Sequence, residues 1–302
     1  MDDKKKLLIP TKGGGTEYYE SEDKTERTKD RQKEDETFVP VIIKRNDVVA
    51  RHADDTLEYS IEEGLEQHTR TNLSLFLSAF SAGLILGFAA MSVALASQFF
   101  TGSDPILYDR LAMALVYPLG FIVCILSRTK LFTEQTATAL YPVLEKKSTF
   151  GSLCRVWTVV LVGNLVGTFS SSLLIYLADG VIGAKAGLIE VAHHLSAHPA
   201  QDILISSILA GWLMAQGGWL ILSTVSSMAQ SACIYIVTFI IGLAGLHHSI
   251  AGSAEIFGAM FFESDPQVLK SLFTVALMAL GNLMGGGFFV AILNYGHIRK
   301  TR

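Results

Sequence analysis

The chain has 302 residues, of which 50% are hydrophobic and 17% are charged, and its mean hydropathy of +0.40 is too high for an ordinary soluble domain. The formal net charge is only −4, with both signs mixed in the N-terminal part, which argues against a nucleic-acid-binding surface. Composition therefore favours a membrane protein.

The N-terminal part, residues 1–70, is rich in Lys, Asp, Glu and Thr and poor in large apolar residues. Such a segment buries too little apolar surface to offset the entropy of ordering, so we expect a largely disordered tail. Near its end, Asp54–Arg70 carries Leu57, Ile61 and Leu65 at four-residue steps. This spacing predicts a short amphipathic helix on the membrane surface or near the mouth of a pore.

Residues 71–298 are predicted to form six membrane spans, because a spanning helix needs about 20 mostly apolar residues. Two of the six are interrupted by polar residues, at Arg128–Glu134 and at Gly245–Gly252. The predicted spans are Thr71–Ser103, Leu111–Leu144 (broken), Val156–Ala178, Ile203–Leu222, Met228–Phe262 (broken) and Ser271–Ile298. The fold class is therefore an all-α membrane protein.

A short internal repeat divides the spans into halves. Gly-Asn-Leu-Val-Gly at Gly163–Gly167 recurs as Gly-Asn-Leu-Met-Gly at Gly281–Gly285, and each copy follows a broken span. Three spans per half, entering from opposite sides, predict an inverted 3+3 repeat with its site where the halves meet. Non-helical backbone at membrane depth is tolerated only inside protein or along a cavity, so the breaks should line a pore.

Cationic residues set the expected orientation, because cytoplasmic loops carry an excess of Lys and Arg. More of them fall on the side of the two termini than on the opposite side, so both termini, including residues 299–302, should be cytoplasmic in a plasma (inner) membrane. The first set is Arg70, Lys146, Lys147, Arg155, Arg299, Lys300 and Arg302, and the second is Arg110, Lys185 and Lys270.

Four pieces in a fixed order resemble the formate/nitrite transporter family: Leu131-Phe132-Thr133, Gly163–Gly167, His248 and Gly281–Gly287. The resemblance covers Asn72–Arg299. It is closest to the YfdC-like branch, which shares the longer Leu-Phe-Thr-Glu-(Asn/Gln)-Thr run and the Gly-Trp-Leu of the fourth span.

The resemblance implies an aquaporin-like protomer with its own pore, assembled as a homopentamer in the lipid bilayer, with formate, nitrite or a similar small anion as substrate and with protons as partners. It also implies that a central His and the Thr of Leu-Phe-Thr, here His248 and Thr133, flank the pore between two apolar constrictions. The constriction candidates are Tyr117, Phe121, Leu131, Phe132 and Ile241.

Three positions depart from the family's usual pattern. Lys130 stands where the typical transporters carry an acidic residue before Leu-Phe-Thr. His247 and Gly252 stand where they carry Glu before the central His and Asn four residues after it. The electrostatics of this pore therefore differ from theirs.

The chemistry expected at His248 follows from the cost of dehydrating an anion in an apolar constriction. A histidine, with a pKa of about 6.5 when unperturbed, is suited to hydrogen-bond or protonate the anion, and Thr133 would supply a second hydrogen bond. The alternative is a buried histidine that packs in the break and bonds to a backbone carbonyl. His247 points about 100° away on a helix and is expected to be structural.

Four charged residues near the breaks are expected to form ion pairs that hold the loops, because charges in membranes usually find partners. The alternative is that the cations attract anions into the vestibule. These residues are Arg128, Lys130, Glu134 and Glu255. Asn164 and Asn282, polar residues in apolar spans, are expected to hydrogen-bond the freed backbone of the adjacent break.

Other function classes find less support. Glu190, His194 and His198 have a zinc-compatible spacing, but a solvated loop is favoured because such short matches are often false. We expect no metal or other cofactor, and no enzyme, since the chain lacks Gly-x-Ser-x-Gly, phosphate-loop and His-Glu-x-x-His runs. A scaffold or sensor that has lost transport and a neutral-solute pore remain alternatives to the anion channel.

Overall fold

The computed structural model describes residues 7–10, 16–19, 51–98 and 105–299, and the chain divides into two compact units, Met1–Val49 and Ala50–Arg302. In the first unit, β1 (Leu7–Pro10) and β2 (Thr16–Tyr19) form an antiparallel hairpin with Leu7 opposite Tyr19. This hairpin was not expected from the composition. The predicted disorder falls mainly on residues outside the described ranges and stays a prediction.

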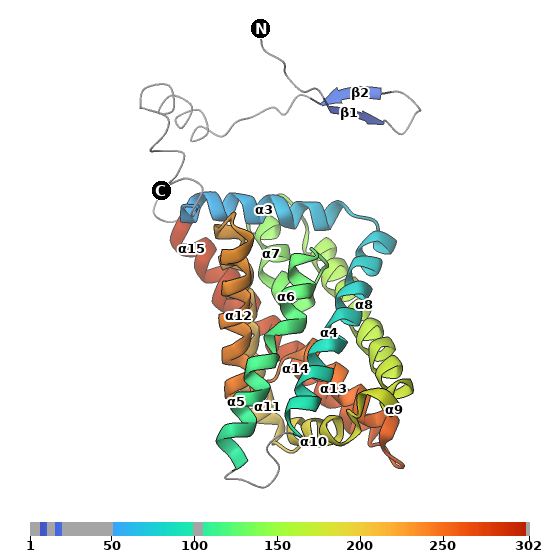
Figure 1. Cartoon of the computed structure of the whole chain (residues 1–302). Helices are drawn as coiled ribbons and strands as arrows, with labels where there is room; N and C mark the ends of the chain where they lie inside the picture. Colours follow the sequence, from blue (N-terminus) through green and yellow to red (C-terminus); the bar gives the residue numbers. More distant parts are fainter. Residues whose placement is uncertain (1–6, 11–15, 20–50, 99–104, 300–302) are drawn as a thin grey trace. The chain divides into compact units, whose positions relative to one another are not determined.

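The second unit is a helical bundle (Figure 1), with α3 across one end and α10 at the other. Five of its helices are long and apolar enough to cross a membrane, so the chain is an all-α membrane protein. The elements are α3 (Ala53–Thr69), α4 (Asn72–Ala96), α5 (Pro105–Val116), α6 (Pro118–Leu126), α7 (Phe132–Leu144), α8 (Phe150–Leu177), α9 (Asp179–Ile182), α10 (Lys185–Ser196), α11 (Ala200–Ser223), α12 (Ser227–Ala244), α13 (Ser249–Phe262), α14 (Val268–Met284), the π-helix η1 (Gly285–Ile292) and α15 (Leu293–Arg299).

The second and fifth spans are broken, whereas α4, α8 and α11 are continuous and α14, η1 and α15 follow one another without a gap. The breaks are shorter than predicted, at 127–131 and 245–248, because α7 already begins at Phe132 and α13 at Ser249. The second span has a further interruption at Tyr117, where Pro118 lacks the N–H that a continuous helix needs.

Glycines of the repeated motif hold two helix pairs in close contact. A Cβ atom on Gly167 of α8 would lie 2.3 Å from the carbonyl oxygen of Phe80 in α4. A Cβ atom on Gly285 would lie 2.2 Å from the carbonyl oxygen of Ile208 in α11. Both contacts require a residue without a side chain, as in other tightly packed membrane helices. The two copies of the motif therefore make equivalent helix–helix contacts in the two halves.

Helix α3 packs on the bundle through the apolar stripe that the sequence predicted. Leu57 and Ile61 are buried in a cluster with Tyr141 of α7 and Val290 of η1. Polar contacts reinforce this packing, because Gln67 donates a hydrogen bond to Gln135 of α7. The helix therefore covers the end of the bundle at which the first break lies.

Candidate functional site

The first break is held by one asparagine side chain. Asn164 Oδ1 accepts a hydrogen bond of 2.7 Å from the backbone N–H of Phe132, the first residue of α7. Asn164 Nδ2 donates to the carbonyl oxygens of Ala79, at 2.7 Å, and Lys130, at 3.0 Å. The helix start and the end of the break, which have no partners within the helix, are thereby fixed to α4 and α8.

The second break repeats this arrangement. Asn282 Oδ1 accepts from the backbone N–H of Ser249 at 2.7 Å, and Asn282 Nδ2 donates to the carbonyl oxygens of Ser207, at 2.7 Å, and His247, at 3.0 Å. The contact predicted between each asparagine and its neighbouring break is thus present in both halves. It makes Phe132 and Ser249 equivalent positions, so α7 and α13 begin in the same way.

The starts of these two short helices meet through Thr133 and His248. Thr133 Oγ1 lies 2.7 Å from His248 Nε2, and the two residues are 0% and 1% exposed. The backbone N–H of Ala251 donates to His248 Nδ1 at 3.2 Å, which caps α13. Because Nδ1 accepts, the hydrogen-bond pattern assigns the ring proton to Nε2, which then donates to Thr133. The threonine hydroxyl hydrogen is left free to donate elsewhere.

An aromatic pair stands beside this contact. The ring of Phe121 meets His248 edge-on at a centroid distance of 5.0 Å, and Tyr117 lies 5.0 Å from Phe121. All five constriction candidates are buried. Tyr117 and Ile241 line a cavity, whereas Leu131 and Phe132 line neither of the two cavities described next.

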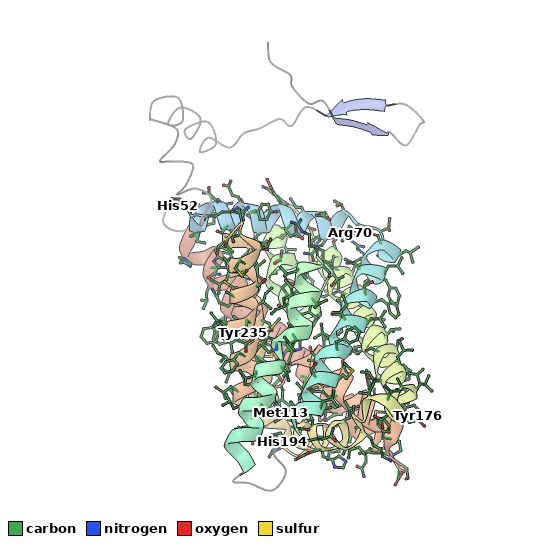
Figure 2. All side chains as sticks on the ribbon, viewed as in Figure 1. His52, Arg70, Met113, Tyr176, His194 and Tyr235 are labelled. Atoms are coloured by element: carbon green, nitrogen blue, oxygen red, sulfur yellow. The ribbon has the colours of Figure 1, made fainter. Side chains whose placement is uncertain are left out.

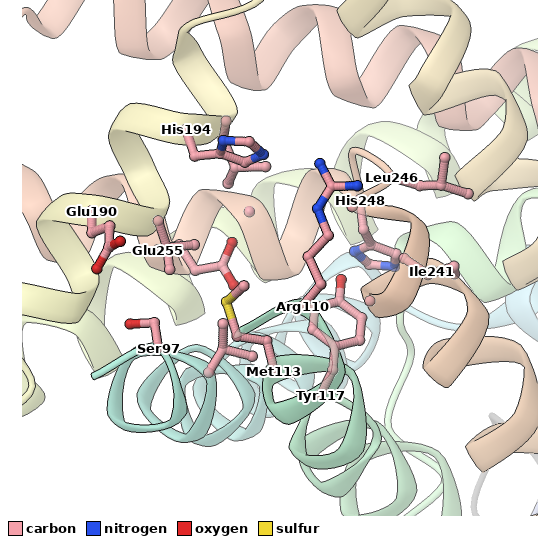
Figure 3. Close-up of a pocket in the computed structure, with 16 residues that line it drawn as sticks. Ser97, Arg110, Met113, Tyr117, Glu190, His194, Ile241, Leu246, His248 and Glu255 are labelled. Atoms are coloured by element: carbon pink, nitrogen blue, oxygen red, sulfur yellow. The ribbon is translucent and has the colours of Figure 1, made fainter. Parts of the chain in front are cut away.

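One cavity, here called the α10 cavity, has a volume of about 420 Å³ and contains His248 in its wall (Figure 3). Glu255 of α13 is also buried in this wall. Arg110, Glu190 and His194 line the same cavity but are exposed. The cavity therefore runs from a charged, solvent-accessible rim to the buried Thr133–His248 contact.

A second cavity, here called the α3 cavity, has a volume of about 410 Å³. Glu134, the residue after Thr133, lines it together with Lys130 and Thr138. Arg51 and Glu63, from the segment that contains α3, and Arg128 of the first break also line it. Among the described residues the two cavities share no lining residue. The Thr133–His248 contact links His248, in the wall of the α10 cavity, to the residue before Glu134, in the wall of the α3 cavity.

The prediction that the charged residues of the two breaks pair with one another is wrong for the residues that the structure describes. Lys130 Nζ pairs with Glu63 of α3, and neither Glu134 nor Glu255 has an ion-pair partner in the part of the chain that the structure describes. The reason is the packing of α3 on α7, which brings Glu63 over the first break. Arg128, exposed and with a left-handed φ of 56°, has no such partner among the described residues either.

His247 is buried but takes no part in the Thr133–His248 contact. Its Nδ1 lies 2.9 Å from Ser206 Oγ, and its Nε2 lies 3.1 Å from the Leu195 carbonyl oxygen. These bonds tie the second break to α10 and α11, so they support a structural role. The segment expected to be a solvated loop is instead largely α10, packed on α13. Within the described ranges no group of three acidic, His or Cys residues is arranged to hold a metal ion.

His194, on α10 outside the spans, has its pKa lowered from the usual value. Partial desolvation of the ring against the cavity wall is the largest cause, and the neighbouring His198 and Arg110 add to it, whereas Glu190 opposes it. Desolvation and nearby cations both disfavour the charged imidazolium. His194 therefore adds no positive charge to that of Arg110 at the rim of the α10 cavity at neutral pH.

Three charged residues of the cavity walls were not expected there from the sequence: Arg51, Glu63 and Arg110. A signal for Glu63 was present. Lys130 is a cation within an apolar region, which requires a partner, and the amphipathic helix at Asp54–Arg70 carries several carboxylates. No pattern in the sequence identifies which of them faces the break.

Comparison with known proteins adds independent findings. The model of the family described as "Formate/nitrite transporter" matches residues 54–296. The chain is 28% identical over 247 residues to "Inner membrane protein YfdC" of Escherichia coli (strain K12), covering 80% of this chain and 78% of that protein. It is 25% identical over 256 residues to "Formate channel FocA" of the same strain, covering 76% and 88%.

Solved structures share the fold. An "FNT family ion channel" superposes with a TM-score of 0.74 at 20% identity, over 81% of this chain and 99% of that one. A "Pentameric formate channel with formate bound" superposes with a TM-score of 0.66 at 21% identity, over 76% and 98%.

Proposed function

Because the chain belongs to the formate/nitrite transporter family, we propose that it is a channel or transporter for small monovalent anions or their conjugate acids. Membership of a family of channels and transporters also weighs against an enzyme. Relatives named as a formate channel and as an inner membrane protein support formate-like substrates and a multi-pass protein of the inner membrane.

The observation that carries this proposal is the Thr133–His248 contact that links the walls of the two cavities. With His248 Nε2–H donating to Thr133, the threonine hydroxyl hydrogen is available to a carboxylate or nitrite oxygen. A buried donor of this kind offsets part of the dehydration cost that an anion meets between the cavities. When an anion displaces Thr133, His248 Nε2–H can donate to it directly.

Two apolar side chains would narrow the path at this contact. Phe121 packs edge-on against His248, and Ile241 lines the wall of the α10 cavity. Both are 0% exposed. A barrier of this kind passes a neutral acid more readily than an ion, so we propose that protons accompany the anion, and His248 assists this passage.

We propose further that the α3 end of the bundle is cytoplasmic and that five protomers assemble, each with its own pore. Arg70 lies at this end (Figure 2), and Arg155 lies beside it, since Arg155 Nη1 donates to the Arg70 carbonyl oxygen at 3.2 Å. The positive-inside rule then assigns this end to the cytoplasm. The pentamer is supported by the formate channel of the same fold, which is described as pentameric.

A neutral-solute pore is the second candidate. Glu134 and Glu255 place a buried carboxyl group in each cavity. If both were ionised, they would repel an anion, which favours an uncharged solute or the conjugate acid of a weak acid.

The test is uptake of labelled formate, nitrite and acetate into proteoliposomes at neutral and at mildly acidic outside pH. Thr133→Val removes the hydroxyl, and His248→Asn keeps a capping oxygen for α13 but is too short to reach Thr133. Both should lower uptake, whereas Thr238→Val, a buried threonine of α12 bonded to its own helix, should not. Uptake that both variants leave unchanged would refute the assigned site. Wild-type protein that carries none of the three solutes would refute the anion function, and glycerol uptake would then support the neutral-solute pore.

A further inference from the structure

Glu255 is a buried carboxyl group beside the proposed transport path, and no cation among the described residues pairs with it. It is 4% exposed and lines the α10 cavity. In the part of the chain that the structure describes, its carboxyl group has no hydrogen-bond or ion-pair partner. Figure 3 shows this carboxyl group and the Arg110 guanidinium directed into the same cavity. A carboxyl group kept in such surroundings without a partner needs a functional explanation.

The contacts of His248 show why a second acid group is needed. To give a proton to an anion, His248 must first be doubly protonated, with hydrogen on both ring nitrogens. Its Nδ1 already accepts the backbone N–H of Ala251 and caps α13. Protonating Nδ1 would break this bond and leave that N–H facing another donor. His248 is therefore built to donate hydrogen bonds, and a proton that travels with the anion must come from another group.

We propose that Glu255 is the proton-exchange group of the pore: it gives its carboxyl proton to a weak-acid anion in the α10 cavity, before the anion reaches Thr133 and His248. This inference rests on the proposed function and specifies its proton donor. Glu255 lies seven residues after His248 on the same helix, which corresponds to roughly 10 Å along the helix axis. The transfer therefore takes place in the cavity, ahead of the apolar contact.

The step is balanced in atoms and charge. The O–H bond of Glu255 breaks and an O–H bond forms on the anion, giving the neutral acid and the Glu255 carboxylate. A hydronium ion from the solution at the exposed rim then returns a proton to the Glu255 carboxylate and leaves water, so that one anion and one proton enter the pore per cycle. The neutral acid then meets Phe121 and His248 without the dehydration cost of an ion.

The ionisable groups around Glu255 are compatible with this cycle. Arg110 and Tyr117 face the cavity from the second span, Glu190 and His194 from α10, and His248 from the second break. Ser97, the residue directly after α4, contributes a hydroxyl group. Arg110 at the rim attracts the anion, and Glu190, which lines the same cavity, offsets part of that charge, so the anion is not held permanently.

The test compares wild-type protein with Glu255→Gln, Glu255→Asp and Glu263→Gln in two measurements. Glu255→Gln keeps shape and polarity but carries no exchangeable acid proton, and Glu255→Asp keeps the acid. Glu263 follows α13 directly, pairs with His193 at 2.6 Å outside the cavity, and serves as the matched control. The measurements are initial uptake of formate, nitrite and acetate driven by an inward proton gradient, and infrared spectra in H2O and D2O.

We expect Glu255→Gln to lower the gradient-driven rate of anion uptake at least about tenfold, as removal of a proton-transfer group typically does. Glu255→Asp should retain most of the wild-type rate. The wild-type spectrum minus that of Glu255→Gln should contain a protonated carboxyl band that shifts in D2O. Transport that Glu255→Gln leaves unchanged in rate and pH profile overturns this inference alone. So does lost transport without the carboxyl band, which would indicate a structural role. Wild-type protein that carries none of the three anions refutes the proposed function and this inference with it.

Discussion

Asn282→Ala tests whether the second break depends on a single side chain. The asparagine makes three hydrogen bonds to backbone groups, with Ser249, Ser207 and His247. The Ser207 carbonyl group lies within α11 and keeps its helical partner. The N–H of Ser249 and the carbonyl group of His247 would be left without theirs. Water cannot easily replace the amide, because α11 is in close contact there: a Cβ on Gly211 would lie 2.3 Å from the Asn282 Cα.

The expected loss follows from these two groups. A buried polar group left unsatisfied costs about 1–3 kcal/mol, so Asn282→Ala should lower the free energy of unfolding by about 2–6 kcal/mol. Because His248 directly follows His247, the freed break should also move His248 away from Thr133. We therefore expect uptake of the transported anion to fall together with stability. Asn164→Ala should act in the same way at the first break.

The assay is unfolding of the purified protein in mixed micelles by a denaturing-detergent titration, with anion uptake measured in parallel. Asn294→Ala, in the same span, is the matched control, because its side-chain nitrogen has no hydrogen-bond partner among the described residues. The reasoning would be refuted if Asn282→Ala and Asn294→Ala lost the same stability. A loss for Asn282→Ala with none for Asn164→Ala would refute the equivalence of the two breaks.

Three further predictions concern contacts outside the central pair. The Lys130 and Glu63 side chains are 7% and 25% exposed, so Glu63→Gln should lower the free energy of unfolding by roughly 1–3 kcal/mol, less than for a fully buried pair. The double variant Lys130→Met with Glu63→Met should recover most of this loss. Equal losses in the single and double variants would contradict this prediction. Gly167→Leu should destabilise the protein by about 3 kcal/mol or more through overpacking against α4, whereas Gly151→Ala, with nothing within 4 Å, should be neutral in thermal unfolding. Because burial lowers the pKa of His194, the unfolded chain binds its proton first. The neutral His194 side chain therefore contributes its full stabilisation above about pH 6.5, the pKa of histidine in the unfolded chain. This stabilisation is lost as the pH falls through the lower pKa of His194 in the folded protein. His194→Gln should flatten that acid-side loss of thermal stability, and an unchanged profile would argue against it.

Much of the bundle could be predicted because its signals are local. The absence of charge over some twenty residues identifies a span, and polar residues within it identify a break. The role of Asn164 and Asn282 follows in the same way, since an amide in an apolar span needs partners and the freed backbone of the nearest break supplies them. These inferences required no knowledge of which helices touch.

The features that were missed depend on contacts between distant parts of the chain. Lys130 pairs with Glu63, 67 residues earlier, and helical periodicity shows that a helix is amphipathic without showing which carboxylate reaches a neighbour. Burial of α10 on α13 likewise depends on tertiary packing. The π-helix at Gly285–Ile292, which begins with three glycines, was also not expected, because the sequence predicted an ordinary span there.

The meeting of α7 and α13 at Thr133 and His248 has a consequence for ions of either sign. Each helix start carries roughly half a positive elementary charge from its aligned peptide groups, concentrated in the first turn. Here two such starts face one site from opposite directions. Peptide dipoles do not titrate, so this field keeps its sign at every pH and whatever protons His248 holds. A sodium or potassium ion therefore meets electrostatic repulsion from the backbone itself, and the surrounding side chains are left to determine which anion or acid passes.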